Sequence, residues 1–221
     1  MVRAVLTDIE GTTSSLSFVK ETLFPYSKRK LREFVAKYSH DPQVQRILEE
    51  VQKIEAGEPA QTLLKWIEED RKITPLKELQ GLIWEEGYRS GELKGHIYED
   101  AYRKLLEWHK RGIPIYIYSS GSVKAQKLLF GHTQYGDLNY LFSGYFDTKV
   151  GNKKEPDSYR RIAKEIGLRP EEVLFLSDNP EEIRASAEAG MRVIRVAREG
   201  ENELIDGFPY LQVRSFEEIE L

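Results

Sequence analysis

The sequence of 221 residues contains no cysteine. That absence excludes disulfide bonds, thiolate metal sites and a cysteine nucleophile, and it is typical of proteins from a reducing compartment. Long apolar runs are also missing, since no stretch approaches the ~20 residues that a membrane-spanning helix needs. The first residues do not resemble a secretory signal. These absences predict a cytoplasmic protein that does not enter a membrane.

An excess of positive charge is a further feature that the sequence lacks. It has 33 lysines and arginines against 37 aspartates and glutamates, which gives a formal net charge of −4 at pH 7. With no strongly basic tract, nucleic acid is not an expected partner. No hydrophobic seam demands a second subunit, so we expect a monomer. At 40% hydrophobic residues the chain can bury a core, as one domain with an insertion or as two small domains.

Residues 14–95 have the pattern of an all-helical insertion. Asp41 followed by Pro42 is a typical N-cap and first-turn pair, which indicates a helix start at this point. We therefore predict a helical cap domain over 14–95, inserted after the first strand. Apolar residues recur at helical spacing within 31–38, 44–54, 63–67 and 76–83.

The remaining sequence alternates short apolar strands with amphipathic helices, which is typical of βαβ units and a parallel sheet. We predict an α/β fold with a doubly wound, mostly parallel sheet. Residues 1–13 and 96–221 would form this catalytic core. Strands are expected in the apolar run before residue 8 and near 113–118, 141–146, 173–176, 193–196 and 211–213.

Two carboxylates, Asp8 and Glu10, follow the first predicted strand. Strand side chains alternate between faces, so these two positions can converge on one site, and Gly11 permits a sharp turn behind them. Ligands of open α/β sheets bind outside the carboxyl ends of the strands. Paired carboxylates there suit metal binding, nucleophilic attack or acid–base catalysis. Taken alone, the pair could also be loop residues or a helix cap.

Two later strands also end in polar residues. Ser119 and Ser120 follow one of them, Asp178 follows the other, and a lysine-rich loop over 149–154 lies between them in the sequence. Carboxylate oxygens suit Mg²⁺, while a hydroxyl and a lysine are natural partners for phosphoryl oxygens. Each feature has a structural alternative, since serines cap helices, lysine runs are often solvated and Asp178 could begin a helix. Their order together favours one phosphate- and metal-binding site.

That order resembles the haloacid dehalogenase-like superfamily of phosphotransferases, whose first motif is Asp-x-Asp and whose core is Rossmann-like. Here Glu10 stands in place of the second aspartate. The neighbouring residues resemble one branch, the enolase-phosphatase E1 family of methionine salvage. The similarity runs from about Val5 to Val196. It is carried by Thr7-Asp8-Ile9-Glu10-Gly11-Thr12-Thr13 and by residues 17–20, 23–26, 115–123, 125–131, 146–151 and 175–178.

The resemblance implies a bifunctional, Mg²⁺-dependent enzyme. It would enolise 2,3-diketo-5-methylthiopentyl-1-phosphate, a small phosphorylated diketone, and then remove its phosphate to give an acireductone. Asp8 would be the nucleophile that forms an aspartyl-phosphate. Glu10 would protonate the leaving oxygen and then activate water.

The resemblance also implies the ligands. Asp8, Glu10 and Asp178 would hold Mg²⁺, with the contributing atom of Glu10 left open because many relatives use the backbone carbonyl there. Lys153 would neutralise phosphate charge and orient Asp8, with Lys149 and Lys154 as weaker candidates. Ser119 and Ser120 would bind substrate oxygens. Asn179 stands where many relatives carry a second acid, so Glu181 or Glu182 is expected only in an outer shell.

Two other functions remain open from the sequence. One is a general phosphatase of small phosphorylated metabolites, and the other is a catalytically silent module that binds a phosphorylated ligand. A dehalogenase fits less well because the acids and the lysine suit Mg²⁺ and phosphate. A dinucleotide-binding protein is disfavoured because the first strand lacks the Gly-x-Gly-x-x-Gly turn. The group that abstracts the carbon-bound proton during enolisation is not indicated.

Overall fold

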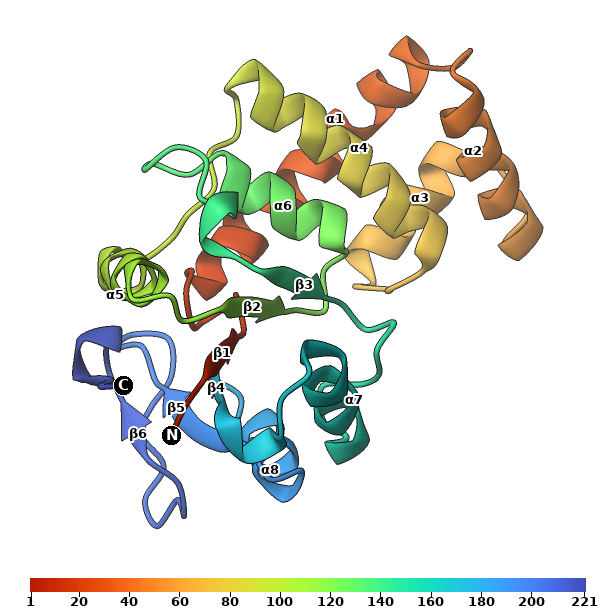
Figure 1. The fold of residues 1–221 in the computed structure, drawn as a ribbon. Helices are drawn as coiled ribbons and strands as arrows, with labels where there is room; N and C mark the ends of the chain where they lie inside the picture. Colours follow the sequence, from red (N-terminus) through yellow and green to blue (C-terminus); the bar gives the residue numbers. More distant parts are fainter. The chain divides into compact units, whose positions relative to one another are not determined.

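The computed structural model describes residues 1–221 and divides them into two compact units. One unit consists of Met1–Leu16 and Gly95–Leu221, and the other is Ser17–Lys94 (Figure 1). The chain therefore leaves the first unit soon after its opening strand and returns to it later. No helix has both the length and the apolar composition that crossing a membrane requires. The role of the second unit as a cap remains a prediction.

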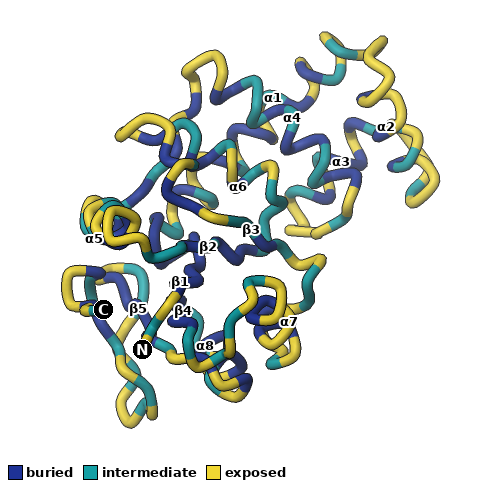
Figure 2. Tube along the Cα trace, in the orientation of Figure 1, coloured by how far each residue is buried: buried dark blue, intermediate teal, exposed yellow.

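The first unit is built on a six-stranded sheet with the strand order β3-β2-β1-β4-β5-β6. Every neighbouring pair is parallel, which confirms the predicted α/β class. β1 and β4 lie side by side at the centre and are buried along their whole length, as expected for a parallel sheet covered on both faces (Figure 2). The strands are β1 (Ala4–Thr7), β2 (Ile115–Tyr118), β3 (Gly144–Phe146), β4 (Val173–Ser177), β5 (Arg192–Val196) and β6 (Gln212–Val213).

Helices cover both faces of this sheet (Figure 1). On one face, Leu6 of β1 and Phe175 of β4 belong to a buried cluster with Tyr159 and Ile162 of α7 and Ile183 of α8. These contacts hold the strand ends that carry the candidate site in a fixed register. The helices of this unit are α5 (Glu99–Lys110), α6 (Val123–Gly131), α7 (Pro156–Ile166) and α8 (Pro180–Glu188), with short 3-10 turns at Asn139–Leu141, Pro170–Glu172 and Phe216–Glu218.

The second unit is entirely helical. Asp41 caps α2 as the sequence predicted, because its side chain accepts hydrogen bonds from the backbone N–H groups of Gln43 and Val44 at 2.9 and 3.2 Å. Its core includes the fully buried Leu63 and Trp66. The elements are a π-helical turn at Phe18–Leu23 followed by α1 (Phe24–Lys37), α2 (Pro42–Ile54), α3 (Pro59–Glu68) and α4 (Thr74–Ser90).

The strand expected near 141–146 is shorter than its apolar residues suggested. Leu141 ends a 3-10 turn, and β3 begins only at Gly144. Phe142 is buried because its ring packs against Phe130 of α6, with centroids 4.7 Å apart, and not because it pairs in the sheet. A two-residue apolar pattern cannot distinguish these two kinds of burial.

His96 lies where the chain re-enters the first unit, and its neutral ring has a structural role. The Nδ1 atom accepts a hydrogen bond from the backbone N–H of Ser15 at 2.9 Å, which a doubly protonated ring cannot do. Burial lowers the pKa of His96; the nearby carboxylate of Glu201 opposes this shift and Arg198 adds to it. A base whose pKa is depressed on folding stabilises the protein above its unfolded pKa, and this stability is lost as the pH falls through the folded pKa.

We therefore expect His96→Asn to weaken the pH dependence of stability between pH 7 and pH 5. The asparagine amide oxygen can accept the same hydrogen bond but does not titrate. Urea unfolding at pH 5, 6 and 7 measures this, with the exposed His40→Asn as the control. An unchanged slope of stability against pH in His96→Asn would contradict the assignment.

Candidate active site

The register of the sheet places Asp8 at its carboxyl edge. Thr7, the last residue of β1, lies opposite Ile117 of β2 and Leu176 of β4. Asp8 continues past the sheet, and its backbone N–H donates to the carbonyl of Leu176 at 2.9 Å. The residues that follow β2 and β4 therefore emerge on either side of Asp8. Ser119 and Asp178 are among them.

Asp8 forms a buried ion pair with Lys153. The Lys153 Nζ lies 2.7 Å from Asp8 Oδ1 and 3.0 Å from Glu182 Oε1. Asp8 and Lys153 are only 5% and 9% exposed, so both charges depend on each other and not on water. Burial alone would lower the pKa of Lys153, but the charges of Asp8 and Glu182 outweigh it and raise that pKa. The ammonium group is therefore charged at neutral pH.

The loop between β3 and α7 presents Lys153 to the site. The Tyr118 hydroxyl donates to the carbonyl of Gly151 at 2.7 Å, and the Tyr159 hydroxyl donates to the carbonyl of Lys153. Gly151 has φ +141°, and a Cβ there would lie 2.2 Å from Ser158 Oγ. Only glycine fits this conformation and this close approach. The lysine is thus fixed by backbone contacts on both sides.

Asp178 lies beside Asp8 on the loop that follows β4. Its Oδ2 accepts a hydrogen bond from Asn202 Nδ2 at 2.9 Å. A Cβ added to Gly11 would lie 2.4 Å from the same oxygen, so the carboxylate packs directly on the turn after Asp8. Burial, followed by the negative charge of Asp8, raises the pKa of Asp178. Full ionisation of both Asp8 and Asp178 is therefore unfavourable at this edge of the sheet.

The predicted substrate-binding serines occupy the neighbouring strand end. Ser119 is buried, and its Oγ accepts a hydrogen bond from the backbone N–H of Gly121 at 3.3 Å. Ser120 is half-buried on the same loop, and Glu10 is half-buried in the turn after β1. The structure thus brings Asp8, Lys153 and Asp178 together. The roles predicted for both serines and for Glu10 stay predictions.

No group of three or more aspartate, glutamate or histidine side chains is arranged to hold a metal ion. The neighbouring carboxyl groups of Asp8 and Asp178 still suit Mg²⁺, which is usually held by one or two carboxylates with water and substrate phosphate completing its shell. The side chains that interact here are three carboxyl groups, from Asp8, Asp178 and Glu182, and the single ammonium group of Lys153. Burial and the charge of Asp8 also raise the pKa of Glu182. These raised pKa values mean that the cluster resists carrying all of its negative charges together, and a divalent cation would relieve that repulsion.

Sequence reasoning missed part of the network. The outer-shell position expected for Glu182 stays a prediction. The structure adds that its Oε1 lies 3.0 Å from Lys153 Nζ and accepts a hydrogen bond from Ser177 Oγ at 3.0 Å. The available signal was its position in the first turn of α8, four residues after Asp178, which turns it back toward the strand end. No local sequence pattern indicates that Asn202 bonds Asp178.

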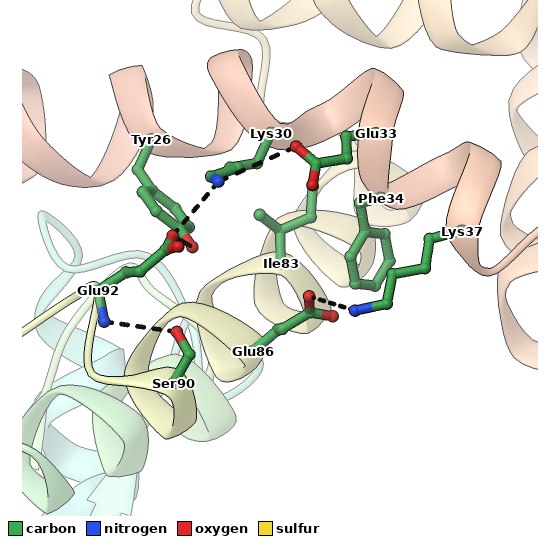
Figure 3. A pocket seen from close by; sticks show the side chains of 9 residues that line it. All are labelled: Tyr26, Lys30, Glu33, Phe34, Lys37, Ile83, Glu86, Ser90 and Glu92. Atoms are coloured by element: carbon green, nitrogen blue, oxygen red, sulfur yellow. Dashed lines mark hydrogen bonds and ion pairs between the residues drawn. The ribbon is translucent and has the colours of Figure 1, made fainter.

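A separate pocket lies on the helical unit, between α1 and α4 (Figure 3). None of the predicted site residues lines it, and its charges are paired internally. Lys37 Nζ lies 3.1 Å from Glu86 Oε1, and Lys30 Nζ lies 3.4 Å from Glu92 Oε2. The paired lysines leave no free cationic surface for a phosphate. The pocket is lined by Tyr26, Lys30, Glu33, Phe34, Lys37, Ile83, Glu86, Ser90 and Glu92.

A parallel α/β sheet with clustered acids and a lysine at its carboxyl edge defines a class of hydrolase. The family model described as haloacid dehalogenase-like hydrolase matches residues 2–190, so the chain is a member of this class. Curated relatives narrow the assignment. The chain is 62% identical to enolase-phosphatase E1 of Sulfurihydrogenibium sp. (strain YO3AOP1), over 100% of this chain and 99% of that protein. It is 60% identical to enolase-phosphatase E1 of Persephonella marina, over 99% of both. The chain therefore belongs to the enolase-phosphatase E1 family.

A solved structure has the same fold as this chain. The UTR4 protein of Saccharomyces cerevisiae matches with a TM-score of 0.86 and 40% identity, over 99% of this chain and 100% of that one. Phosphatases of this family generally use a divalent metal ion. That requirement is consistent with the carboxylates found at the sheet edge.

Proposed function

We propose that this chain converts 2,3-diketo-5-methylthiopentyl-1-phosphate to the dephosphorylated acireductone, 1,2-dihydroxy-3-keto-5-methylthiopentene, in methionine salvage. The observation that carries the proposal is similarity over the full length to curated enzymes named enolase-phosphatase E1. The buried pair of Asp8 and Lys153 supplies a nucleophile held beside a fixed positive charge. We further propose that the protein is cytoplasmic and acts as a monomer. Sedimentation of the purified protein tests the monomeric state.

Asp8 is the proposed nucleophile. One of its carboxylate oxygens attacks phosphorus, and the bond between phosphorus and the substrate's C1 oxygen breaks. Glu10 gives its proton to that leaving oxygen. A water molecule then loses a proton to Glu10 and attacks the phosphorus of the aspartyl-phosphate, which releases phosphate and restores the Asp8 carboxylate. Both halves of the reaction need in-line positioning and charge neutralisation more than covalent assistance.

Lys153 and the serines support this chemistry. The Lys153 ammonium holds one Asp8 oxygen at 2.7 Å, which leaves the carboxylate oriented for attack, and it neutralises charge on the phosphoryl oxygens. Ser119 and Ser120 would donate hydrogen bonds to substrate oxygens. Ser119 Oγ accepts from Gly121, so its own proton is directed to another acceptor.

Asp8, Glu10 and Asp178 would hold Mg²⁺. When bound, the ion would neutralise the phosphoryl oxygens and the surplus carboxylate charge of the site. Asn202 and Gly11 hold the Asp178 carboxylate against the turn after Asp8, so this one ligand is prearranged by the protein.

Steady-state kinetics test the proposal. We expect the diketo phosphate to be the best substrate among a panel of sugar phosphates, with loss of dicarbonyl absorbance accompanying phosphate release, and both signals to need Mg²⁺. Equal activity on simple sugar phosphates without a dicarbonyl signal would favour a general phosphatase. Tight Mg²⁺-dependent binding without phosphate release would favour a silent binding module.

A further inference from the structure

The segment that follows β5 reaches back to the candidate site from a distant part of the sequence. Asn202 lies 24 residues after Asp178, yet its side-chain Nδ2 donates to Asp178 Oδ2 at 2.9 Å. The backbone of Asp178 is held from the same direction, since Arg195 Nε donates to its carbonyl at 2.7 Å. Asp178 is thus fixed at both its backbone and its side chain by residues in and after β5.

Asn202 is itself held in place. Its backbone N–H donates to the carbonyl of Arg198 at 2.9 Å, and Arg214 Nη1 donates to the carbonyl of Asn202 at 2.9 Å. Because both sides of its backbone are anchored, the side chain starts from a fixed point, and its bond to Asp178 sets the direction of the amide.

Arg198, which holds the backbone of Asn202, also bonds the loop that follows Asp8. Arg198 is 5% exposed, and its guanidinium donates to the carbonyl of Thr12 at 3.0 and 2.7 Å. Its Nη1 also bonds both carboxylate oxygens of Asp100, at 2.8 and 2.7 Å. A doubly bonded buried arginine is a rigid support. The same short segment therefore holds the two loops that carry Asp8 and Asp178.

A carboxylate is planar, so fixing one oxygen fixes the direction of the other. Asn202 and the backbone at Gly11 define the place of Oδ2 of Asp178, and Oδ1 then has one direction available. We propose that Asn202 is a positioning residue that orients Asp178 for a divalent cation. This inference rests on the proposed metal-binding role of Asp178.

The test measures Mg²⁺ affinity without substrate. Groups that orient metal ligands contribute about 10–100-fold in metal affinity. We expect Asn202→Leu, which keeps the branching at Cγ but removes the amide, to bind Mg²⁺ at least about 10-fold more weakly by calorimetry. Its phosphatase kcat should recover toward the native value at saturating Mg²⁺, because the residue acts through the cation. Asn202→Ser is the second variant, in case leucine disturbs the fold, and metal-free thermal unfolding checks both.

Two further variants separate the possible failures. Glu199→Gln alters an exposed residue of the same segment and should keep native Mg²⁺ affinity. Asp178→Asn should lose Mg²⁺ binding. If Asp178→Asn loses binding while folded Asn202→Leu and Asn202→Ser stay within twofold of native, the role of Asn202 is overturned and the proposed metal site stands. If Asp178→Asn also binds normally, the metal site itself is wrong.

Discussion

Replacing Asp8 with asparagine is expected to abolish phosphate release while leaving the protein folded. The amide cannot attack phosphorus to form a stable acyl phosphate, so we expect kcat to fall by at least about 10⁴-fold. The fold should survive because Lys153 keeps Glu182 as an ionic partner at 3.0 Å and Asp178 loses a repulsive neighbour. Phosphate release, with circular dichroism and thermal unfolding of the same samples, measures both parts.

The matched control is Asp137→Asn, which changes an exposed aspartate on a loop without any predicted site residue. Its Oδ1 accepts a hydrogen bond from the backbone N–H of Asn139 at 2.9 Å, so near-native turnover is expected. A direct observation is also available, because an acyl phosphate survives acid quenching. Label from a phosphoryl-labelled substrate should remain on the native protein and be absent from Asp8→Asn. Near-native activity in Asp8→Asn would refute the nucleophile assignment.

The fold and the centre of the site could be predicted because they depend on local patterns. The alternation of apolar strands and amphipathic helices specified a parallel sheet, and a parallel sheet brings the carboxyl ends of its strands to one edge. Asp8 and Asp178 follow directly after β1 and β4, which are neighbours. Their proximity therefore followed from topology alone. Lys153 was chosen from a run of lysines by resemblance, and the structure buries it where it exposes Lys154.

The rest of the network depends on contacts that no short pattern contains. Asn202 reaches Asp178 only because the loop after β5 folds back, and this geometry is set by Arg198 and Arg214. The contact between Glu182 and Lys153 was equally hard to predict. The sequence indicates that a helix begins near Pro180, but it does not say whether Glu182 faces the sheet or the solvent. Contacts between side chains that lie tens of residues apart depend on tertiary packing, and no local sequence pattern reports that packing.

Replacing Lys153 with methionine is expected to cost both stability and activity. The change leaves the buried carboxylates of Asp8 and Glu182 without their shared cation, and breaking a buried ion pair typically costs about 3–5 kcal/mol of unfolding free energy. Loss of a charge that stabilises the transferring phosphoryl group should lower kcat by about 10²–10³-fold. Urea unfolding in the presence of a chelator and steady-state kinetics measure the two effects separately.

The neighbouring lysine provides the control. Lys154 Nζ pairs with Glu181 Oε2 at 3.2 Å, but both side chains are largely exposed, so Lys154→Met should cost less than about 1 kcal/mol and leave turnover near native. The double variant Lys153→Met/Glu182→Gln removes one stranded charge, and it should regain stability relative to Lys153→Met without regaining activity. Stability and activity respond differently in this double variant only if Lys153 has two roles. It neutralises buried acids in the resting protein, and it neutralises the phosphoryl group during turnover. Equal losses of stability in Lys153→Met and Lys154→Met would show that the buried cluster does not depend on this ammonium group.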